Sequence, residues 1–155
     1  MNFDQAFDRL INHEGGYVND SRDPGGQTKY GISKRSYPYH DILNMTLDQA
    51  KAIYRKDFWN AVRADELPEA VRFSVFDTAV NAGIPRAIRF LQRAARVDDD
   101  GVLGPITMQA VASANPGILV ARFNGYRMDH LNDLKIWPTY GRGWSQRIAE
   151  NLMEL

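Results

Sequence analysis

The residues with the clearest chemical potential gather in one stretch near the N-terminus, residues 13–32. Glu14 stands directly before a glycine pair, and the polar run that follows contains the carboxylates Asp20 and Asp23. Cleavage of a glycosidic bond needs one carboxylic acid that is kept neutral to protonate the leaving oxygen. It commonly needs a second acidic group that positions water or shields the reacting carbon. We therefore predict Glu14 as the acid and either Asp23 or Asp20 as the second group.

Each part of this stretch also has an ordinary structural interpretation. A Glu before Gly-Gly is usually a solvated residue at a helix end, and an Asp-Pro-Gly-Gly run, here residues 23–26, is usually a turn. The stretch nevertheless combines Glu, Asp, Thr and Tyr in a glycine-rich segment that is too polar for a core, and binding and catalytic residues are often found in such segments. Their concentration favours a functional site.

Asp77 and Asn81 are a second pair of candidates, four residues apart on a helix whose other positions are mostly apolar, so they share one face. They could hydrogen-bond to the backbone of the polar loop, because buried polar groups need partners. They could instead line a sugar-binding cleft. For Asn81 both interpretations stay open, whereas for Asp77 the structural one is favoured, since a lone buried carboxylate would need a donor nearby.

Neither a metal nor another cofactor is predicted. The three histidines stand at positions 13, 40 and 130, without the spacing of metal ligands. The acidic run Asp98-Asp99-Asp100-Gly101 lacks the alternating frame and the distal Glu of a calcium loop, so it is interpreted as a turn that ends a helix.

Two further groups could contact a polymer. A basic stripe at helical spacing could weakly anchor an anionic polymer, although most such stripes are only solvated; it consists of Arg86, Arg89, Arg93 and Arg96. Three aromatic residues in a Pro/Gly-rich segment could stack on sugars, but an aromatic cover at the edge of the core is the favoured interpretation; they are Trp137, Tyr140 and Trp144.

The elements that must position these residues are mostly helices. Apolar residues recur at helical spacing, proline and glycine punctuate the pattern, and Thr46 to Gln49 has the form of a capping box. Residues 17–32 read as a loop or small hairpin, and the apolar positions of 68–82 cover so much of the circumference that this helix should be central and buried. The expected helices cover residues 3–14, where the glycine pair 15–16 ends the first one, then 46–58, 68–82, 85–96, 104–112, 116–134 and a last one from about 143. The fold class is mainly α with a small N-terminal β region.

Composition limits the function. The 155 residues, 44% of them hydrophobic, suit one globular domain. Lys+Arg and Asp+Glu both total 19, which disfavours nucleic-acid binding, and the absence of cysteine excludes thiolate chemistry and disulfides. We expect neither a signal peptide nor a membrane span, because the chain shows no basic start followed by a long apolar run.

The polar stretch also resembles a known family. Glu14, eight residues, Asp23, four residues and Thr28 resemble the Glu-x8-Asp-x5-Thr arrangement of phage-type lysozymes, with one residue fewer in the second gap. The sequence HEGGYVNDSRDPGGQTKYGIS is similar to the opening of glycoside hydrolase family 108, phage and prophage muramidases of the lysozyme superfamily. The resemblance continues in FDTAVNAG, residues 76–83, and in DGVLGPIT, residues 100–107.

The resemblance implies a lysozyme-like helical domain over 1–155, with a catalytic segment 1–84 and a peptidoglycan-binding-like helical segment 85–155. It implies hydrolysis of the β-1,4 bond between N-acetylmuramic acid and N-acetylglucosamine. Glu14 would be the general acid, and Asp23 and Thr28 would hold the attacking water. The expected substrate-binding residues are Asp20, Tyr30 and Asn81. The alternatives are a lytic transglycosylase, which needs only one carboxylate, and a non-catalytic peptidoglycan-binding module.

This assignment predicts peptidoglycan glycan strands as the partner of a monomeric protein, with no nucleic acid and no stable membrane association. The expected role is that of an endolysin. It would be made in the cytoplasm of the host bacterium and act on the wall in the periplasm, after a separate protein has permeabilised the membrane.

Overall fold

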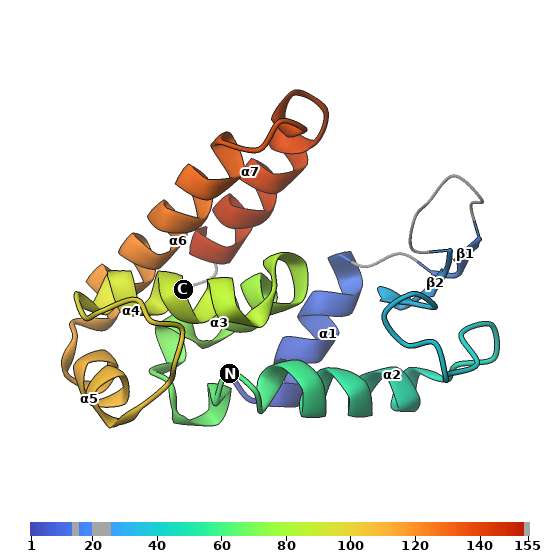
Figure 1. The fold of residues 1–155 in the computed structure, drawn as a ribbon, viewed down its shortest axis with the longest axis horizontal. Helices are drawn as coiled ribbons and strands as arrows, with labels where there is room; N and C mark the ends of the chain where they lie inside the picture. Colours follow the sequence, from blue (N-terminus) through green and yellow to red (C-terminus); the bar gives the residue numbers. More distant parts are fainter. Residues whose placement is uncertain (14–15, 20–25, 154–155) are drawn as a thin grey trace. The chain divides into compact units, whose positions relative to one another are not determined.

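The computed structural model describes residues 1–13, 16–19 and 26–153. The chain forms two compact units, an N-terminal unit, Met1–Asp57, and a C-terminal unit, Phe58–Leu155. Figure 1 traces the elements of both units.

The helices of the N-terminal unit begin at side-chain caps. α1 (Phe3–His13) starts after Asn2, whose side chain and backbone exchange hydrogen bonds of 3.0 Å with Gln5. α2 (Leu47–Tyr54) starts after Thr46, which makes the same reciprocal pair of bonds with Gln49 and so confirms the predicted capping box. A π-helical turn, η1 (Arg55–Trp59), continues α2.

A small antiparallel sheet follows α1 in the sequence. Its strands pair in the order β1 (Val18–Asn19), β2 (Gln27–Lys29) and β3 (Ile32–Ser33). Tyr30 and Gly31 join β2 to β3 with φ angles of 51° and 76°, as expected for a two-residue type I′ turn. The predicted small hairpin region is therefore present.

Aromatic packing connects these elements. The rings of Phe7 on α1 and Tyr54 on α2 lie 5.7 Å apart, and both side chains are buried. The Tyr54 hydroxyl donates a 2.8 Å hydrogen bond to the Tyr30 carbonyl, which ties the β2–β3 turn to α2. The hydroxyl of a buried tyrosine needs such a partner.

Among its described residues, the regular elements of the C-terminal unit are all helices. A short 3₁₀ turn, η2 (Ala64–Glu66), precedes α3 (Glu69–Ala82), which packs against both α4 (Ile84–Ala95) and α6 (Pro116–Asn132). α5 (Pro105–Ser113) packs on α4, and α7 (Trp137–Met153) lies beside α6 (Figure 1). Most α3 side chains between Val71 and Ala79 are buried, so this helix is central, as predicted.

Glycine and proline set several boundaries in this unit. Gly83 ends α3 with a φ of 94° that disfavours any side chain, and Pro85 occupies the first turn of α4. Pro105 and Pro116 stand in the first turns of α5 and α6. These starts agree with the predicted ones to within one residue.

The acidic run after α4 is a turn, as predicted. Its anchor is the buried Gln92, whose amide NH2 donates to the Asp100 carboxylate at 2.7 Å and to the Val102 carbonyl at 3.0 Å. The Gln92 side-chain oxygen accepts from the Gly101 N–H at 2.8 Å. Because the NH2 group of this buried amide donates and its oxygen accepts, the Gln92 side chain holds the turn against α4.

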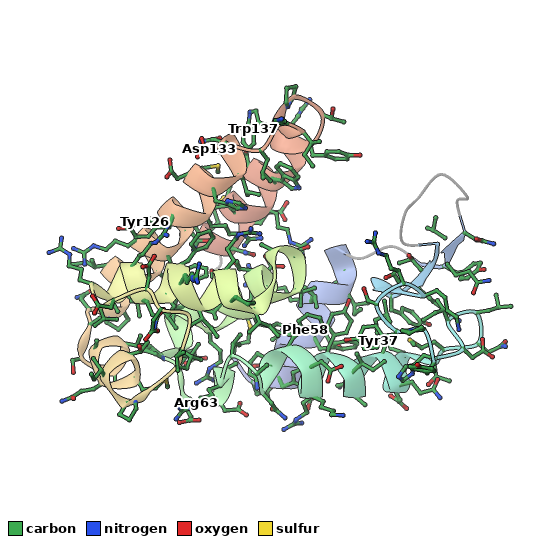
Figure 2. All side chains as sticks on the ribbon, in the orientation of Figure 1. Tyr37, Phe58, Arg63, Tyr126, Asp133 and Trp137 are labelled. Carbon is green, nitrogen blue, oxygen red and sulfur yellow. The ribbon has the colours of Figure 1, made fainter. Side chains whose placement is uncertain are left out.

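The predicted start of the last helix at about residue 143 is wrong, because α7 begins at Trp137. Pro138 is in its first turn, where its missing N–H costs nothing. Gly141 is buried, and a Cβ there would lie 2.5 Å from two ring atoms of Trp137. The glycine that suggested a loop instead makes room for this ring, which Figure 2 shows near the end of the α6–α7 pair.

The mainly α fold with a small N-terminal β region is confirmed. Among the described residues, no helix combines the length and the apolar character needed to cross a membrane.

Candidate active site

Three of the predicted site residues, Glu14, Asp20 and Asp23, lie outside the described residues. The described part of α1 ends at His13, which precedes Glu14 in the sequence. The structure places the other predicted residues, Thr28, Tyr30 and Asn81.

Thr28 occupies the middle of the small sheet. It pairs with Val18 on one neighbouring strand and with Ser33 on the other, so these three side chains share one face of the sheet. The side chain is partly exposed, and its hydroxyl lies 3.5 Å from the Gly26 carbonyl oxygen, the outer limit of a hydrogen bond. A hydroxyl can both donate and accept, so Thr28 can bind a water or a sugar hydroxyl there.

Tyr30 stands at the tip of the β2–β3 turn. The Tyr54 hydroxyl fixes its carbonyl, and the Lys29 ammonium lies 5.5 Å from the centre of its ring. Lys29 also donates to the Leu43 carbonyl at 3.0 Å, which connects the strand to the segment before α2. Tyr30 thus has a fixed backbone and a partly exposed ring, two residues after Thr28 on the same hairpin.

A polar pair in the N-terminal unit was not predicted. The Tyr37 hydroxyl donates a 3.0 Å hydrogen bond to the Asp57 carboxylate. Burial, together with the bond to this carboxylate, raises the pKa of Tyr37 well above its usual range. The two residues are twenty positions apart, and no local sequence pattern links them.

Asn81 belongs to the C-terminal unit, and its side-chain NH2 is used internally. It donates to the Asp77 carbonyl at 2.7 Å and to the Asp77 carboxylate at 3.0 Å. The residue as a whole remains exposed at the end of α3. Asn81 therefore makes structural contacts within its own helix, whereas the structural interpretation expected the backbone of the polar loop as its partner. Its exposure leaves the substrate-binding interpretation a prediction.

Asp77 is fully buried and binds two arginines. Its carboxylate pairs with the Arg127 guanidinium of α6 at 2.7 Å and accepts from Nε of Arg147 of α7 at 2.9 Å. Asn151 of α7 donates at 3.2 Å. Burial alone would raise the pKa of Asp77, but the charges of the two arginines outweigh it, so the pKa is lowered.

The structural interpretation of Asp77 was correct, but the expected partner was wrong. The polar loop was expected to supply the donors, whereas helices α6 and α7 supply them. Part of this could be read from the sequence, because Arg127 follows the buried Phe123 by four residues and so continues the inward face of α6.

The arginines of the basic stripe on α4 make different contacts. Arg93 pairs with Asp99 at 2.5 Å, and Arg86 donates to the Ala82 carbonyl at 2.9 Å. Arg96 ends the helix in a left-handed conformation, and its side chain lines a pocket against α6. Only part of the stripe is therefore available to a partner.

The aromatic residues that were expected in a loop lie on the first turns of α7. The Tyr140 ring stacks on Trp144 with centroids 5.8 Å apart, and Trp137 lies 6.1 Å from Trp144. Tyr140 is 54% exposed, so this cluster covers the helix end rather than filling the core. Elsewhere, among the residues that the structure describes, no three His, Cys, Asp or Glu side chains gather as metal ligands would.

Comparisons with known proteins agree on the family. Residues 7–83 match the family model described as Glycosyl hydrolase 108, and residues 86–149 match that described as Predicted Peptidoglycan domain. The structure of Brucella abortus SagA superposes with a TM-score of 0.88 at 31% sequence identity, covering 98% of this chain and 92% of SagA. A comparison with curated protein sequences finds no match.

The first matched range contains every predicted site residue from Glu14 to Asn81, and the second contains the arginines of the α4–α6 region. A fold shared over nearly the full length of both chains supports both matches. The chain is a glycoside hydrolase that acts on peptidoglycan, and it belongs to glycosyl hydrolase family 108.

Proposed function

We propose that this enzyme is a muramidase that hydrolyses the β-1,4 bond between N-acetylmuramic acid and N-acetylglucosamine. The observation that carries the proposal is the family match over residues 7–83, which includes Glu14, Asp23 and Thr28. Glycoside hydrolysis with two carboxylates requires one acid and one group that activates or holds water. These three residues supply both functions.

In the proposed reaction, Glu14 gives its proton to the glycosidic oxygen as the bond from that oxygen to the anomeric carbon breaks. A water held by Asp23 and Thr28 attacks the same carbon from the opposite face, and Asp23 accepts the proton that the water loses. The products are a new reducing end and a free sugar hydroxyl. Attack from the opposite face inverts the anomeric configuration.

The described hairpin supports the role of Thr28. Its hydroxyl lies on the middle strand of the sheet and is partly exposed, and among the described residues its one hydrogen-bond contact is a long one with the Gly26 carbonyl. Such a hydroxyl can accept a water as partner at little cost. Tyr30, partly exposed on the same hairpin, would contact the sugar, and so would Asp20. Asn81 of the C-terminal unit is proposed separately as a substrate-binding residue.

The decisive experiment is digestion of purified peptidoglycan followed by mass spectrometry. We expect reducing N-acetylmuramic acid ends from the natural chain and no cleavage by Glu14→Gln, because the amide keeps the shape and loses the transferable proton. Circular dichroism should show the same helical content for both proteins. Predominantly 1,6-anhydro ends, one water lighter, would instead identify a lytic transglycosylase.

We also propose a phage lysis role, in which a separate permeabilising protein gives the enzyme access to the wall. Chloroform-treated Gram-negative cells should lose turbidity when the purified protein is added, and Glu14→Gln should have no effect. A protein that sediments with the wall but leaves the turbidity of these cells unchanged would be a binding module.

A further inference from the structure

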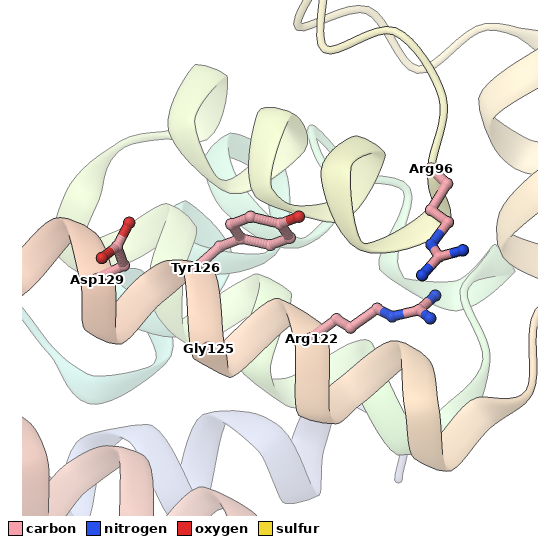
Figure 3. A pocket seen from close by; sticks show the side chains of 5 residues that line it. All are labelled: Arg96, Arg122, Gly125, Tyr126 and Asp129. Atoms are coloured by element: carbon pink, nitrogen blue, oxygen red, sulfur yellow. The ribbon is translucent and has the colours of Figure 1, made fainter.

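A pocket of about 350 Å³ opens on the C-terminal unit, between the end of α4 and the outer face of α6 (Figure 3). Its size lies at the lower end of the roughly 300–1,000 Å³ that small-ligand pockets span. Its lining residues are Arg96, Arg122, Gly125, Tyr126 and Asp129.

Sequence and backbone explain how the pocket forms. Arg122, Tyr126 and Asp129 follow one another at helical spacing, so they share one face of α6. Gly125 leaves space there, because a Cβ at this position would meet nothing within 4 Å. Across from them, Arg96 ends α4 at a φ of 60°, and its side chain lines the pocket.

Positive and negative side chains lie at opposite ends of the pocket. Figure 3 shows the guanidinium groups of Arg96 and Arg122 near each other at one end, Asp129 at the other and the Tyr126 ring between them. Among the described residues, neither of these two arginines forms an ion pair, in contrast to Arg93. Two neighbouring guanidinium groups without an anion favour a carboxylate, which each can bind through two parallel hydrogen bonds.

We propose that this pocket binds the peptide stem of peptidoglycan. A stem carboxylate would lie between Arg96 and Arg122, an amino group of the stem would meet Asp129, and aliphatic carbons would pack on the Tyr126 ring. The inference rests on the proposed function only in taking peptidoglycan as the polymer. The pocket lies within the range matched by the peptidoglycan domain, residues 86–149.

Phosphate groups of wall polymers present similar anionic chemistry to the two arginines. Asp129 argues against them, because a phosphate chain running along the pocket would meet this carboxylate and be repelled. A peptide stem carries both signs of charge and suits both ends. A binding experiment can therefore distinguish a peptide stem from a wall-polymer phosphate.

The test is calorimetric titration of the full chain with a free tetrapeptide stem that carries no sugar and so cannot be hydrolysed. We expect Arg122→Gln and Arg96→Gln each to weaken binding about tenfold or more, because a charge-assisted bond is lost. Arg142→Gln, which removes an exposed guanidinium outside the pocket, should bind like the natural chain.

A second pair of variants tests whether binding needs the open volume of the pocket, rather than the charge of its arginines. Gly125→Leu should fill the pocket and abolish stem binding, whereas Gly125→Ala should retain most of it. Equal affinities across all variants, or no binding of the stem by the natural chain, would overturn the proposal. So would glycerol phosphate that displaces the stem at equal concentration.

Hydrolysis is measured separately on glycan strands whose stems have been removed. The arginine variants should cut these strands at the natural rate, since the pocket contacts the stem alone. An enzyme that binds the stem through the pocket but cuts no glycan would contradict the proposed function while supporting this inference.

Discussion

At the scale of single residues, Asp77 shows how a buried charge can organise helices. One carboxylate on α3 contacts guanidinium groups from α6 and α7, so three helices share one polar centre. The guanidinium of Arg127 is almost as buried as its partner, and one of its nitrogens, Nη1, has no hydrogen-bond partner among the described groups. The stability of the fold is sensitive to substitution at this centre, because removing the carboxylate leaves unpaired positive charge buried in the unit.

The first prediction is that Asp77→Asn lowers the free energy of unfolding by about 3–5 kcal/mol, the usual cost of breaking a buried ion pair from one side. Denaturation by urea, followed by circular dichroism, measures it. Asp99→Asn is the matched control, because it removes an exposed carboxylate that also pairs with an arginine and should change stability little. Equal effects of the two variants would contradict the structural role of Asp77.

A second prediction separates the two candidate carboxylates of the polar stretch. Asp23→Asn should lower turnover by orders of magnitude, whereas Asp20→Asn should leave turnover largely intact and act through loop stability. Steady-state rates and melting temperatures of both variants decide between them. A comparable loss of activity in Asp20→Asn with an unchanged melting temperature would reverse the ranking.

The sequence predicted part of the Asp77 arrangement. Burial of a carboxylate on an apolar helix required a donor, and that requirement was met. The identity of the donors depends on which helices pack together, over sequence separations of 50 and 70 residues. Helical spacing could place Arg127 on the inward face of α6, but it carries no information on which residue it pairs with, so the pairs of Asp77 with Arg127 and Arg147 were missed.

At the scale of elements, most boundaries followed from local chemistry. The capping box at Thr46 and the prolines in the first turns of α4, α5 and α6 are local signals, and the structure confirms them. The start of α7 was missed because two glycines and a proline normally indicate a loop. There the contact of Gly141 with Trp137 overrides intrinsic propensity.

The third prediction compares the two glycines of α7. Gly141→Ala should destabilise the C-terminal unit, because its Cβ would lie 2.5 Å from the Trp137 ring and push it outward. Gly143→Ala should stabilise the unit by roughly 0.5–1 kcal/mol, since a Cβ there meets nothing within 4 Å and alanine favours a helix.

Urea denaturation and the near-ultraviolet dichroism of the tryptophans measure both effects. The dichroism of Gly141→Ala should change, and that of Gly143→Ala should stay like that of the natural chain. Stabilisation by both substitutions would show that the Trp137 ring moves freely and that its contact with Gly141 does not determine the helix start.

At the scale of the whole molecule, composition and helical periodicity were sufficient to predict the fold class. They could not divide the chain into its units, because the division after Asp57 falls inside the π-helical turn Arg55–Trp59, where the sequence shows no linker. The segments 1–84 and 85–155 remain a prediction about function. The glycosyl hydrolase match, residues 7–83, extends across the division between units, so the enzyme must be tested as the full chain.

The last prediction concerns the pH dependence of the full chain, in which the proposed mechanism and the stability of the fold depend on different carboxylates. Activity should follow a bell-shaped curve, because the proposed mechanism needs Glu14 protonated and Asp23 ionised at once. The stability of the fold also falls at low pH, through the protonation of Asp77. Since folding lowers the pKa of Asp77, its contribution is complete above the unfolded value of about 3.9 and is lost as pH falls through the lower folded value.

These two acid effects can be separated by their reversibility and by melting temperature. Activity should begin to fall on the acid side while the melting temperature is still unchanged, and it should return at once when the pH is raised, because protonation of Asp23 leaves the fold intact. Unfolding of the C-terminal unit should begin only at lower pH. In Asp23→Asn any residual activity should lose the acid limb, since the titrating group is gone. An acid limb that instead follows the fall in melting temperature would mean that activity reports unfolding through Asp77, and Asp23 would then lose its assigned role.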